Sequence, residues 1–291
     1  MTYSSCNLCP RECGVDRRKT RGYCGARDNA IVAKTMLHFW EEPCVSGTKG
    51  SGAVFFSGCN LRCNFCQNRD ISFTLRGEEY TAEMLTEKFF ELAREGAHNI
   101  NLVTATPYLP TVTDAIIRAK THGLNLPVVY NTGGYEKVEA SRALNGLVDV
   151  YLHDFKYSCS ALSAKYSGAQ DYPEIAMRAI DEMVKSVGTP IFENGLIKKG
   201  VIIRHLVLPG HKEDSKAVLR AIAEQWGTDV TVSVMRQFTP EFASEDCDLK
   251  RRITTYEYNS VLEEADRLGL SGYAQGADSA TADYTPDFAN K

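Results

Sequence analysis

Short apolar runs alternate with segments of helical periodicity along most of the chain. The apolar runs predict six strands, at 53–57, 100–104, 127–130, 148–152, 201–207 and 230–235. Helices are expected at 81–95, after Pro110, and at 160–187, 213–226 and 255–268. Strands that alternate with helices are typical of an α/β protein with a parallel sheet. Because eight β/α units close a full barrel, six units predict a partial (β/α)6 TIM-like barrel that stays open.

The two ends of the chain do not follow this alternation. We expect residues 1–50 to form a small N-terminal segment that is rich in cysteine and includes a connector. The connector-like sequence runs from residue 31 to residue 52, across the start of the barrel. Residues 51–240 would then form the barrel, and residues 241–291 a C-terminal helix and tail. From Ala277 to Lys291 the tail is polar and lacks periodicity, which predicts loose order.

The composition is that of an ordinary globular protein, with 43% hydrophobic and 24% charged residues among 291. No apolar run approaches the roughly 20 residues that span a bilayer, and the N-terminus shows no signal peptide. The net charge of −4 gives no general attraction to nucleic acid or acidic lipid. We therefore expect a cytoplasmic protein that binds neither a membrane nor nucleic acid. Its ten cysteines favour metal sites over disulfides.

Three cysteines with C-x3-C-x2-C spacing directly follow the first predicted strand: Cys59, Cys63 and Cys66. A loop this short can place three thiolates on one face of an iron–sulfur cluster, which normally has four cysteine ligands. One iron is then left without a protein ligand and is open to a small molecule. A zinc knuckle is the alternative, but structural zinc sites use four ligands, commonly as two close pairs. This cysteine triplet has no such pairs, so it predicts a [4Fe–4S] cluster.

A second group of cysteines, the N-terminal cysteine group, lies within the first 24 residues: Cys6, Cys9, Cys13 and Cys24. Four thiols with glycine and proline between them could close around one metal ion or one cluster. We expect a second metal site here, either zinc or an auxiliary iron–sulfur cluster. An electron-transfer role makes the cluster slightly the better fit. Four thiols without metal are the alternative.

Polar residues follow several predicted strands, at the edge where parallel α/β sheets build their sites. Thr104 and Thr106 follow the second strand, and their hydroxyls could meet the charged ends of an amino acid or cap the next helix. The run Asn131-Thr132-Gly133-Gly134 follows the third strand. Paired glycines let a backbone approach a ligand closely, while Asn and Thr supply hydrogen bonds. A ribose or a methionine carboxylate would fit there, and an ordinary tight turn is the alternative.

The fourth and fifth strands carry charged residues. Asp154 and Lys156 stand two apart, so they share one face of an extended segment. They are candidate catalytic residues that would bind a cofactor or substrate or assist proton transfer, unless they form a solvated ion pair. Arg204 and His205 must face opposite sides of their strand, so one of them looks into the barrel. We take His205 as a candidate cofactor-binding residue, although a lone strand histidine is often structural.

Together these motifs resemble the radical S-adenosylmethionine (radical SAM) superfamily, and within it the group that includes pyruvate formate-lyase activating enzyme. The resemblance rests on the cysteine triplet with Phe65 inside it, on Asn131-Thr132-Gly133, on Asp154-Phe155-Lys156 and on the segment 204–210. It implies that S-adenosylmethionine (SAM) chelates the open iron through its amino and carboxylate groups. An electron from the cluster then yields methionine and a 5′-deoxyadenosyl radical. It also implies a cofactor contact for Phe65 and a reductant such as flavodoxin or ferredoxin.

With the N-terminal cysteine group and the segment 96–101, the chain is similar to a narrower family of activating-enzyme-like iron–sulfur proteins. Activating enzymes usually carry Gly-Gly-Glu after the second strand to hold the methionine amino group, whereas this chain has Thr104-Ala105-Thr106 there. The resemblance implies a monomer that acts on a protein or peptide. A glycyl-radical protein is the first candidate substrate. A peptide, nucleotide or small metabolite is the second, and a metal-binding electron carrier without catalysis is the third reading.

Overall fold

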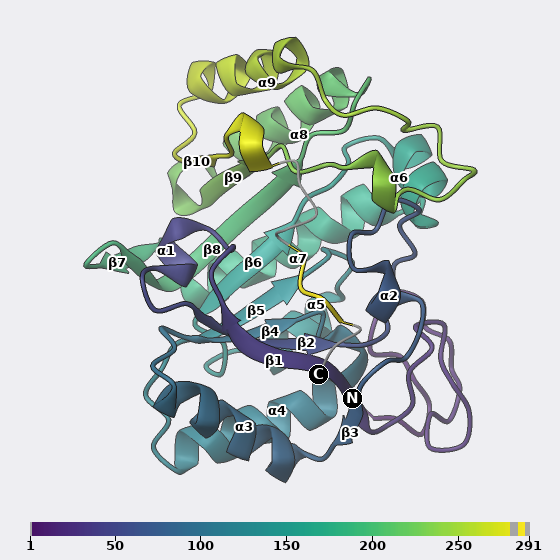
Figure 1. Cartoon of the computed structure of the whole chain (residues 1–291), viewed down its shortest axis with the longest axis vertical. Helices are drawn as coiled ribbons and strands as arrows, with labels where there is room; N and C mark the ends of the chain where they lie inside the picture. The colour runs from purple at the N-terminus through teal and green to yellow at the C-terminus, as the bar shows by residue number, and fades with distance from the viewer. Residues whose placement is uncertain (1, 280–284, 289–291) are drawn as a thin grey trace.

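The computed structural model describes residues 2–279 and 285–288. Its centre is one sheet with the strand order β10-β9-β8-β6-β5-β4-β2-β1-β3 (Figure 1). The consecutive parallel strands are β2 (Ser51–Phe56), β4 (Ile100–Val103), β5 (Val128–Thr132), β6 (Val150–Asp154), β8 (Leu196–Leu206), β9 (Thr231–Met235) and β10 (Gly272–Ala274). In the described part of the chain, β10 and β3 stand at opposite edges and do not pair with each other. The prediction of an α/β partial barrel is therefore confirmed.

The other edge of the sheet is antiparallel. There β1 (Ala30–His38) pairs with β2 and with β3 (Glu78–Tyr80). Away from this edge, a short β7 (Ile191–Glu193) pairs antiparallel with the beginning of β8. The prediction of a connector from residue 31 onward was therefore wrong. Most side chains of β1 are only half-buried. Polar residues are tolerated there, and the alternation that marks a strand is blurred.

Helices follow the parallel strands and cover the outside of the sheet (Figure 1). They are α3 (Ala82–Arg94), α4 (Leu109–Thr121), α5 (Val138–Ala143), α6 (Ser160–Ser167), α7 (Tyr172–Val187), α8 (Lys212–Gln225) and α9 (Thr255–Arg267). Shorter turns are α1 (Pro43–Ser46), α2 (Arg69–Ser72), η1 (Thr106–Tyr108), η2 (Gly227–Asp229), η3 (Pro240–Phe242) and η4 (Ala277–Ser279). The predicted helix at 160–187 is two helices, because Gly168 adopts a left-handed φ of 61° and ends α6.

The two faces of the strands have different neighbours. Side chains on the outer face join the large core beneath the helices, for example Tyr130, Tyr151 and Ile203. Side chains on the inner face pack against Cys44 and Val45 of α1 and fill the barrel: Val129, Val150, Leu152 and Ile202. Because side chains alternate with period two, the next inner positions after this apolar layer are Asn131, Asp154 and Arg204. The sheet thus ends in polar groups on its concave side.

The C-terminal segment returns to the first barrel strand. The ring of Phe288 lies 5.5 Å from that of Phe55 in β2, and Gln67 donates to Thr285 Oγ1 at 2.6 Å. Of the tail predicted to be loosely ordered, residues 280–284 and 289–291 lie outside the described residues. The division at residues 50 and 240 stays a prediction, although β1 and β10 belong to the same sheet as the barrel strands. None of the described helices combines the length and apolar character that a membrane crossing requires.

Candidate active site

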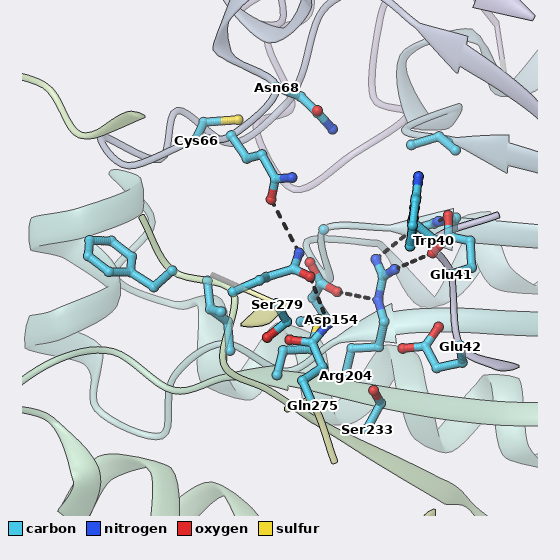
Figure 2. Close-up of a pocket in the computed structure, with 18 of the residues that line it drawn as sticks. Trp40, Glu41, Glu42, Cys66, Asn68, Asp154, Arg204, Ser233, Gln275 and Ser279 are labelled. Carbon is cyan, nitrogen blue, oxygen red and sulfur yellow. Dashed lines mark hydrogen bonds and ion pairs between the residues drawn. The ribbon is translucent and has the colours of Figure 1, made fainter. Parts of the chain in front are cut away.

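The carboxyl ends of the parallel strands surround a cavity of about 450 Å³ (Figure 2). Three parts of the chain form its wall. These are the strand ends with their loops, the residues 38–43 between β1 and α1, and the C-terminal residues that follow β10. A cavity of this size at strand ends is where α/β proteins place their chemistry.

All three cysteines of the triplet line this cavity. Their loop begins at Gly58, whose φ of 86° and approach to the carbonyl oxygen of Cys24 leave no room for a side chain. Asn60 Nδ2 donates to the carbonyl of Tyr135 at 2.6 Å and fixes the middle of the loop. Cys63 Sγ shares a hydrogen bond of 3.0 Å with Ser167 Oγ. The loop therefore holds three thiols in place from one short stretch of sequence.

The donor set fits an iron–sulfur cluster. Burial raises the pKa of the thiols of Cys59 and Cys63, and that of Cys66 to about 11, so only a bound metal would keep them as thiolates. Among the described residues, no three His, Cys, Asp or Glu side chains converge on a point where one metal ion would sit. A single zinc ion needs its sulfur ligands about 2.3 Å from one centre, whereas a cluster spreads its ligands over several irons.

Beside the triplet lies a network of buried charges. Asp154 accepts from Lys156 Nζ at 2.5 Å and from Arg204 Nε at 2.9 Å. Burial alone would raise the pKa of Asp154, but Arg204 and Lys156 outweigh burial and hold the pKa at about 2. Arg204 also donates to Glu41 Oε2 at 3.1 Å and to Asn131 Oδ1 at 2.6 Å. The site thus carries fixed, paired charges next to the cysteines.

Glu41 of this network was not among the predicted site residues. Its carboxylate accepts from Asn101 Nδ2 at 3.0 Å and from Asn131 Nδ2 at 2.9 Å, as well as from Arg204. It lies in the stretch that we expected to be a connector. The adjacent acids Glu41 and Glu42 before Pro43 were the feature that could have pointed to it.

The two threonines after β4 have different surroundings. Thr104 lines the cavity and adopts a φ of 62°, which is unusual for a β-branched residue and typical of functional sites. Thr106 lies outside the lining. Its hydroxyl donates to Glu136 Oε1 at 2.5 Å and accepts from Tyr130 at 3.2 Å. The expected cofactor contact of Thr106 is therefore not seen, because the buried carboxyl of Glu136 uses its proton.

The run Asn131-Thr132-Gly133-Gly134, at the end of β5, also divides into residues inside and outside the cavity lining. Asn131, Thr132 and Gly133 line the cavity. Gly134 does not, and a Cβ at this residue would lie 2.0 Å from the carbonyl oxygen of Asp154. Its glycine therefore serves the close packing of two loops, contrary to the expected cofactor contact. The hydroxyl of Thr132 donates to Glu136 Oε1 at 2.5 Å.

On β8, Arg204 takes the inward position. His205 is on the opposite face, where its Nδ1 lies 2.8 Å from the carbonyl oxygen of Phe155. His205 is 1% exposed, and it is not among the described residues that line the cavity. The choice of His205 over Arg204 is therefore corrected. Phe65, in contrast, lines the cavity and packs edge-on against Tyr166 and Phe238.

The N-terminal cysteine group gathers behind the triplet loop. Cys6, Cys9 and Cys24 are buried, and Cys13 is half-buried. A side chain at Gly22 would lie 3.3 Å from Cys13 Sγ and 3.6 Å from Cys24 Sγ. Burial, with smaller contributions from the nearby Cys24 and Cys6, raises the pKa of Cys9 to about 12. The four thiols therefore share one small region.

A buried arginine lies in the same region. Arg17 is 1% exposed, and its Nη1 lies 3.9 Å from Cys6 Sγ. Its other hydrogen bonds go to backbone carbonyls, at 3.2 Å to Ala26 and at 2.5 Å to Pro107. Within residues 2–279 and 285–288, no carboxylate forms an ion pair with this guanidinium. A buried cation without an anion is costly, so the thiols are its natural counter-charge.

The model of the Radical SAM superfamily matches residues 53–222, more than half of the chain. The chain belongs to the radical SAM superfamily. The matched stretch contains the triplet and Asp154, Lys156 and Arg204, and the family implies a [4Fe–4S] cluster and SAM, which suit the thiols described above. The protein is therefore an enzyme of the radical SAM class.

Two curated relatives and one solved structure show how the chain compares with known proteins. The uncharacterized protein MJ0674 of Methanocaldococcus jannaschii is 31% identical over 277 residues, covering 92% of this chain and 76% of the relative. The pyruvate formate-lyase-activating enzyme of Clostridium pasteurianum is 29% identical over 180 residues, covering 58% and 66%. A radical SAM methyltransferase from Sphaerobacter thermophilus has a TM-score of 0.54 at 17% identity, covering 80% of this chain and 69% of that one. The last match shows a shared fold alone.

Proposed function

We propose that this radical SAM enzyme abstracts a hydrogen atom from an organic substrate held in the cavity. One observation carries the proposal: the cysteine triplet and the ion network of Asp154, Lys156 and Arg204 face the same cavity. When bound, a [4Fe–4S] cluster supplies the electron that cleaves SAM to methionine and a 5′-deoxyadenosyl radical.

The residues of this chain bind and shield these groups. The triplet supplies the cluster ligands, and Asp154 with Lys156 offers a fixed pair of opposite charges to the charged parts of SAM. Asn131 and Gly133 present hydrogen bonds and an open backbone to the ribose or the methionine carboxylate. Phe65 helps to keep water away from this region.

The first candidate substrate is a backbone glycine of a partner protein. The similarity to an enzyme named for activating pyruvate formate-lyase supports it. Electron paramagnetic resonance tests it directly. A glycine-centred radical would appear on a candidate glycyl-radical enzyme mixed with this protein, SAM and reductant, and its absence from all candidates tried would count against this substrate.

The second candidate is a peptide, nucleotide or small metabolite. The C-terminal segment favours it, because Gln275, Ser279 and Pro286 line the cavity and narrow the space for a loop of a folded partner. A smaller molecule needs no displacement of this segment. Crude metabolite fractions that raise the turnover of SAM would identify its class.

We also propose that the N-terminal cysteine group holds an auxiliary iron–sulfur cluster that passes electrons inward from a flavodoxin or ferredoxin. The counter-charge of Arg17 supports an anionic metal–thiolate centre. Anaerobic protein would then contain about eight irons per chain, against about four for the triplet alone.

The decisive experiment removes the triplet. Joint substitution of Cys59, Cys63 and Cys66 by Ala should abolish formation of 5′-deoxyadenosine from SAM and reductant, while circular dichroism shows a retained fold. Cys159→Ala is the matched control, because Cys159 is exposed and lies outside the cavity wall as described. Full cleavage in the triple variant would end the proposal.

A further inference from the structure

The end of the cavity opposite the cysteines contains a carboxylate without an ion partner. Figure 2 shows Glu42 and Ser233 at one side of the cavity and Cys66 across from them. Glu42 is 8% exposed, and its Oε2 has no hydrogen-bond partner among the described residues. A buried carboxylate oxygen without a partner is costly unless something else binds it.

The backbone fixes this side chain in position. Glu42 directly precedes α1, and its carbonyl oxygen accepts from the amides of Val45 at 2.7 Å and Ser46 at 3.1 Å. Cys44 and Val45 are in turn packed inside the barrel against the strands. The carboxylate of Glu42 is therefore held at the cavity by a rigid anchor.

The nearby cations already serve other acids. Arg204 binds Glu41 and Asp154, and Lys156 binds Asp154. Within the described residues, four acidic side chains line the cavity against two basic ones: Glu41, Glu42, Asp154, Asp278, Lys156 and Arg204. The protein's own cations thus leave Glu42 without an ion partner. Burial raises the pKa of its carboxyl, so a cationic ligand is what would favour the ionised form.

Exposed aromatic side chains also line the cavity. Phe39 and Trp40 line the cavity and are 50% and 57% exposed, which is high for large aromatic residues. The bare carboxylate oxygen and the excess of acidic groups favour a positively charged ligand. The exposed ring of Phe39 adds apolar surface for an alkyl chain.

We infer that Glu42 and Ser233 form a subsite for an alkylammonium group of the substrate. This inference rests on the proposed function, because it concerns the substrate of the same cavity. An ammonium carries three donors that a carboxylate oxygen and a hydroxyl can accept. A guanidinium prefers two parallel bonds to both oxygens of one carboxylate, whereas Glu42 offers one bare oxygen, Oε2. An anion would meet the excess of acid.

The test is anaerobic calorimetry on the cluster-loaded, SAM-bound protein with n-butylammonium chloride as the probe. Butylammonium should bind, while n-butanol and butyrate should not. Glu42→Gln should weaken binding at least about tenfold, and Ser233→Ala should weaken it by a smaller factor. Glu193→Gln is the matched control, because it removes the same charge from the exposed hairpin strand β7.

Several results would overturn the inference. These are no binding of butylammonium to the wild type, equal binding of butanol, tighter binding of n-butylguanidinium, or unchanged affinity in Glu42→Gln. Butylammonium that displaces SAM would assign this end of the cavity to SAM instead. If Glu42→Gln does not fold, Ser233→Ala and the probe series decide. SAM cleavage measured on the same wild-type sample separates the two proposals, since a protein that binds butylammonium but never cleaves SAM would refute only the function.

Discussion

Single residues of the cavity are charged although they are buried, and each charge depends on its partners. Asp154 is the centre of this arrangement, because it binds Lys156 and Arg204 at once. In a medium of low polarity, a charge that loses its partner costs far more than the pair contributed. Conservative changes at such positions should therefore have large effects.

Asp154→Asn should leave Lys156 and Arg204 without their shared carboxylate. We expect a loss of about 3 kcal/mol in the free energy of unfolding and a drop in SAM affinity of at least about tenfold. Urea unfolding and equilibrium binding of SAM measure both. Asp181→Asn breaks a surface pair with Lys185 and should change stability by no more than about 0.5 kcal/mol. Equal effects of the two substitutions would contradict this view of the site.

Glu136 should make stability depend on pH. Burial raises its pKa to about 7, whereas the unfolded chain loses this proton near pH 4.3. Between these values the folded protein holds a proton that the unfolded chain has released, so stability should fall as pH rises to about 7 and then level off. Across this window the free energy of unfolding should fall by about 4 kcal/mol.

Glu136→Gln keeps an acceptor for Thr106 and Thr132 and removes the titration. The variant should show a flatter stability profile between pH 5 and 7 by urea unfolding, and the exposed Glu139→Gln should follow the wild type. Parallel profiles of wild type and Glu136→Gln would show that this carboxyl does not titrate in that window.

At the scale of elements, the pattern of apolar residues predicted the strands that are mostly buried and missed those that are only partly buried. Six of the seven parallel strands were predicted, and five of these are buried throughout while β8 is buried over its central part. The seventh, β10, has three residues that are exposed or half-buried, and it was missed. β1 is mostly half-buried and was missed, and with it Glu41 and Glu42 in the loop that follows. His205 was chosen over Arg204 because alternation says that they face apart but not which one faces inward. Only the register with Asp154, the partner of Arg204 on β6, decides that question.

In the N-terminal segment, we expect metal binding by the cysteine group to depend on Arg17. Arg17→Met removes the buried cation beside the N-terminal cysteine group, so an anionic metal–thiolate centre loses its counter-charge. We expect anaerobic protein to lose the second metal, about four irons per chain, and to keep the triplet cluster. Arg18→Met is the control, since Arg18 pairs with Asp16 at the surface.

A stability readout distinguishes a missing metal from a damaged fold. Metal loading should raise the melting temperature of the wild type more than that of Arg17→Met, because binding to the folded state alone stabilises it. Identical metal content in the two proteins would refute the role of Arg17 as counter-charge.

At the scale of the whole molecule, both ends of the chain reach the barrel mouth. The N-terminal segment contacts the triplet loop, where Arg11 Nε donates to the carbonyl of Asn60 at 2.8 Å. The C-terminal segment contributes Gln275 and Pro286 to the cavity wall. Neither contact follows from local sequence pattern, because both join residues far apart in the chain. The open barrel could be predicted, but the parts that complete its cavity could not.

Phe288 tests whether the C-terminal contact matters for the cavity. Its ring packs against Phe55, which itself lines the cavity, and an edge-to-face aromatic pair contributes about 1 kcal/mol. Phe288→Ala should therefore weaken the attachment of the segment and speed SAM dissociation about fivefold, a factor that matches this energy. Stopped-flow chase of bound SAM measures the rate, with Phe192→Ala on the exposed β7 as the control. An unchanged rate would mean that the segment lines the cavity without retaining its ligand, so that SAM is held by the strand ends and their loops without help from the contact of Phe288.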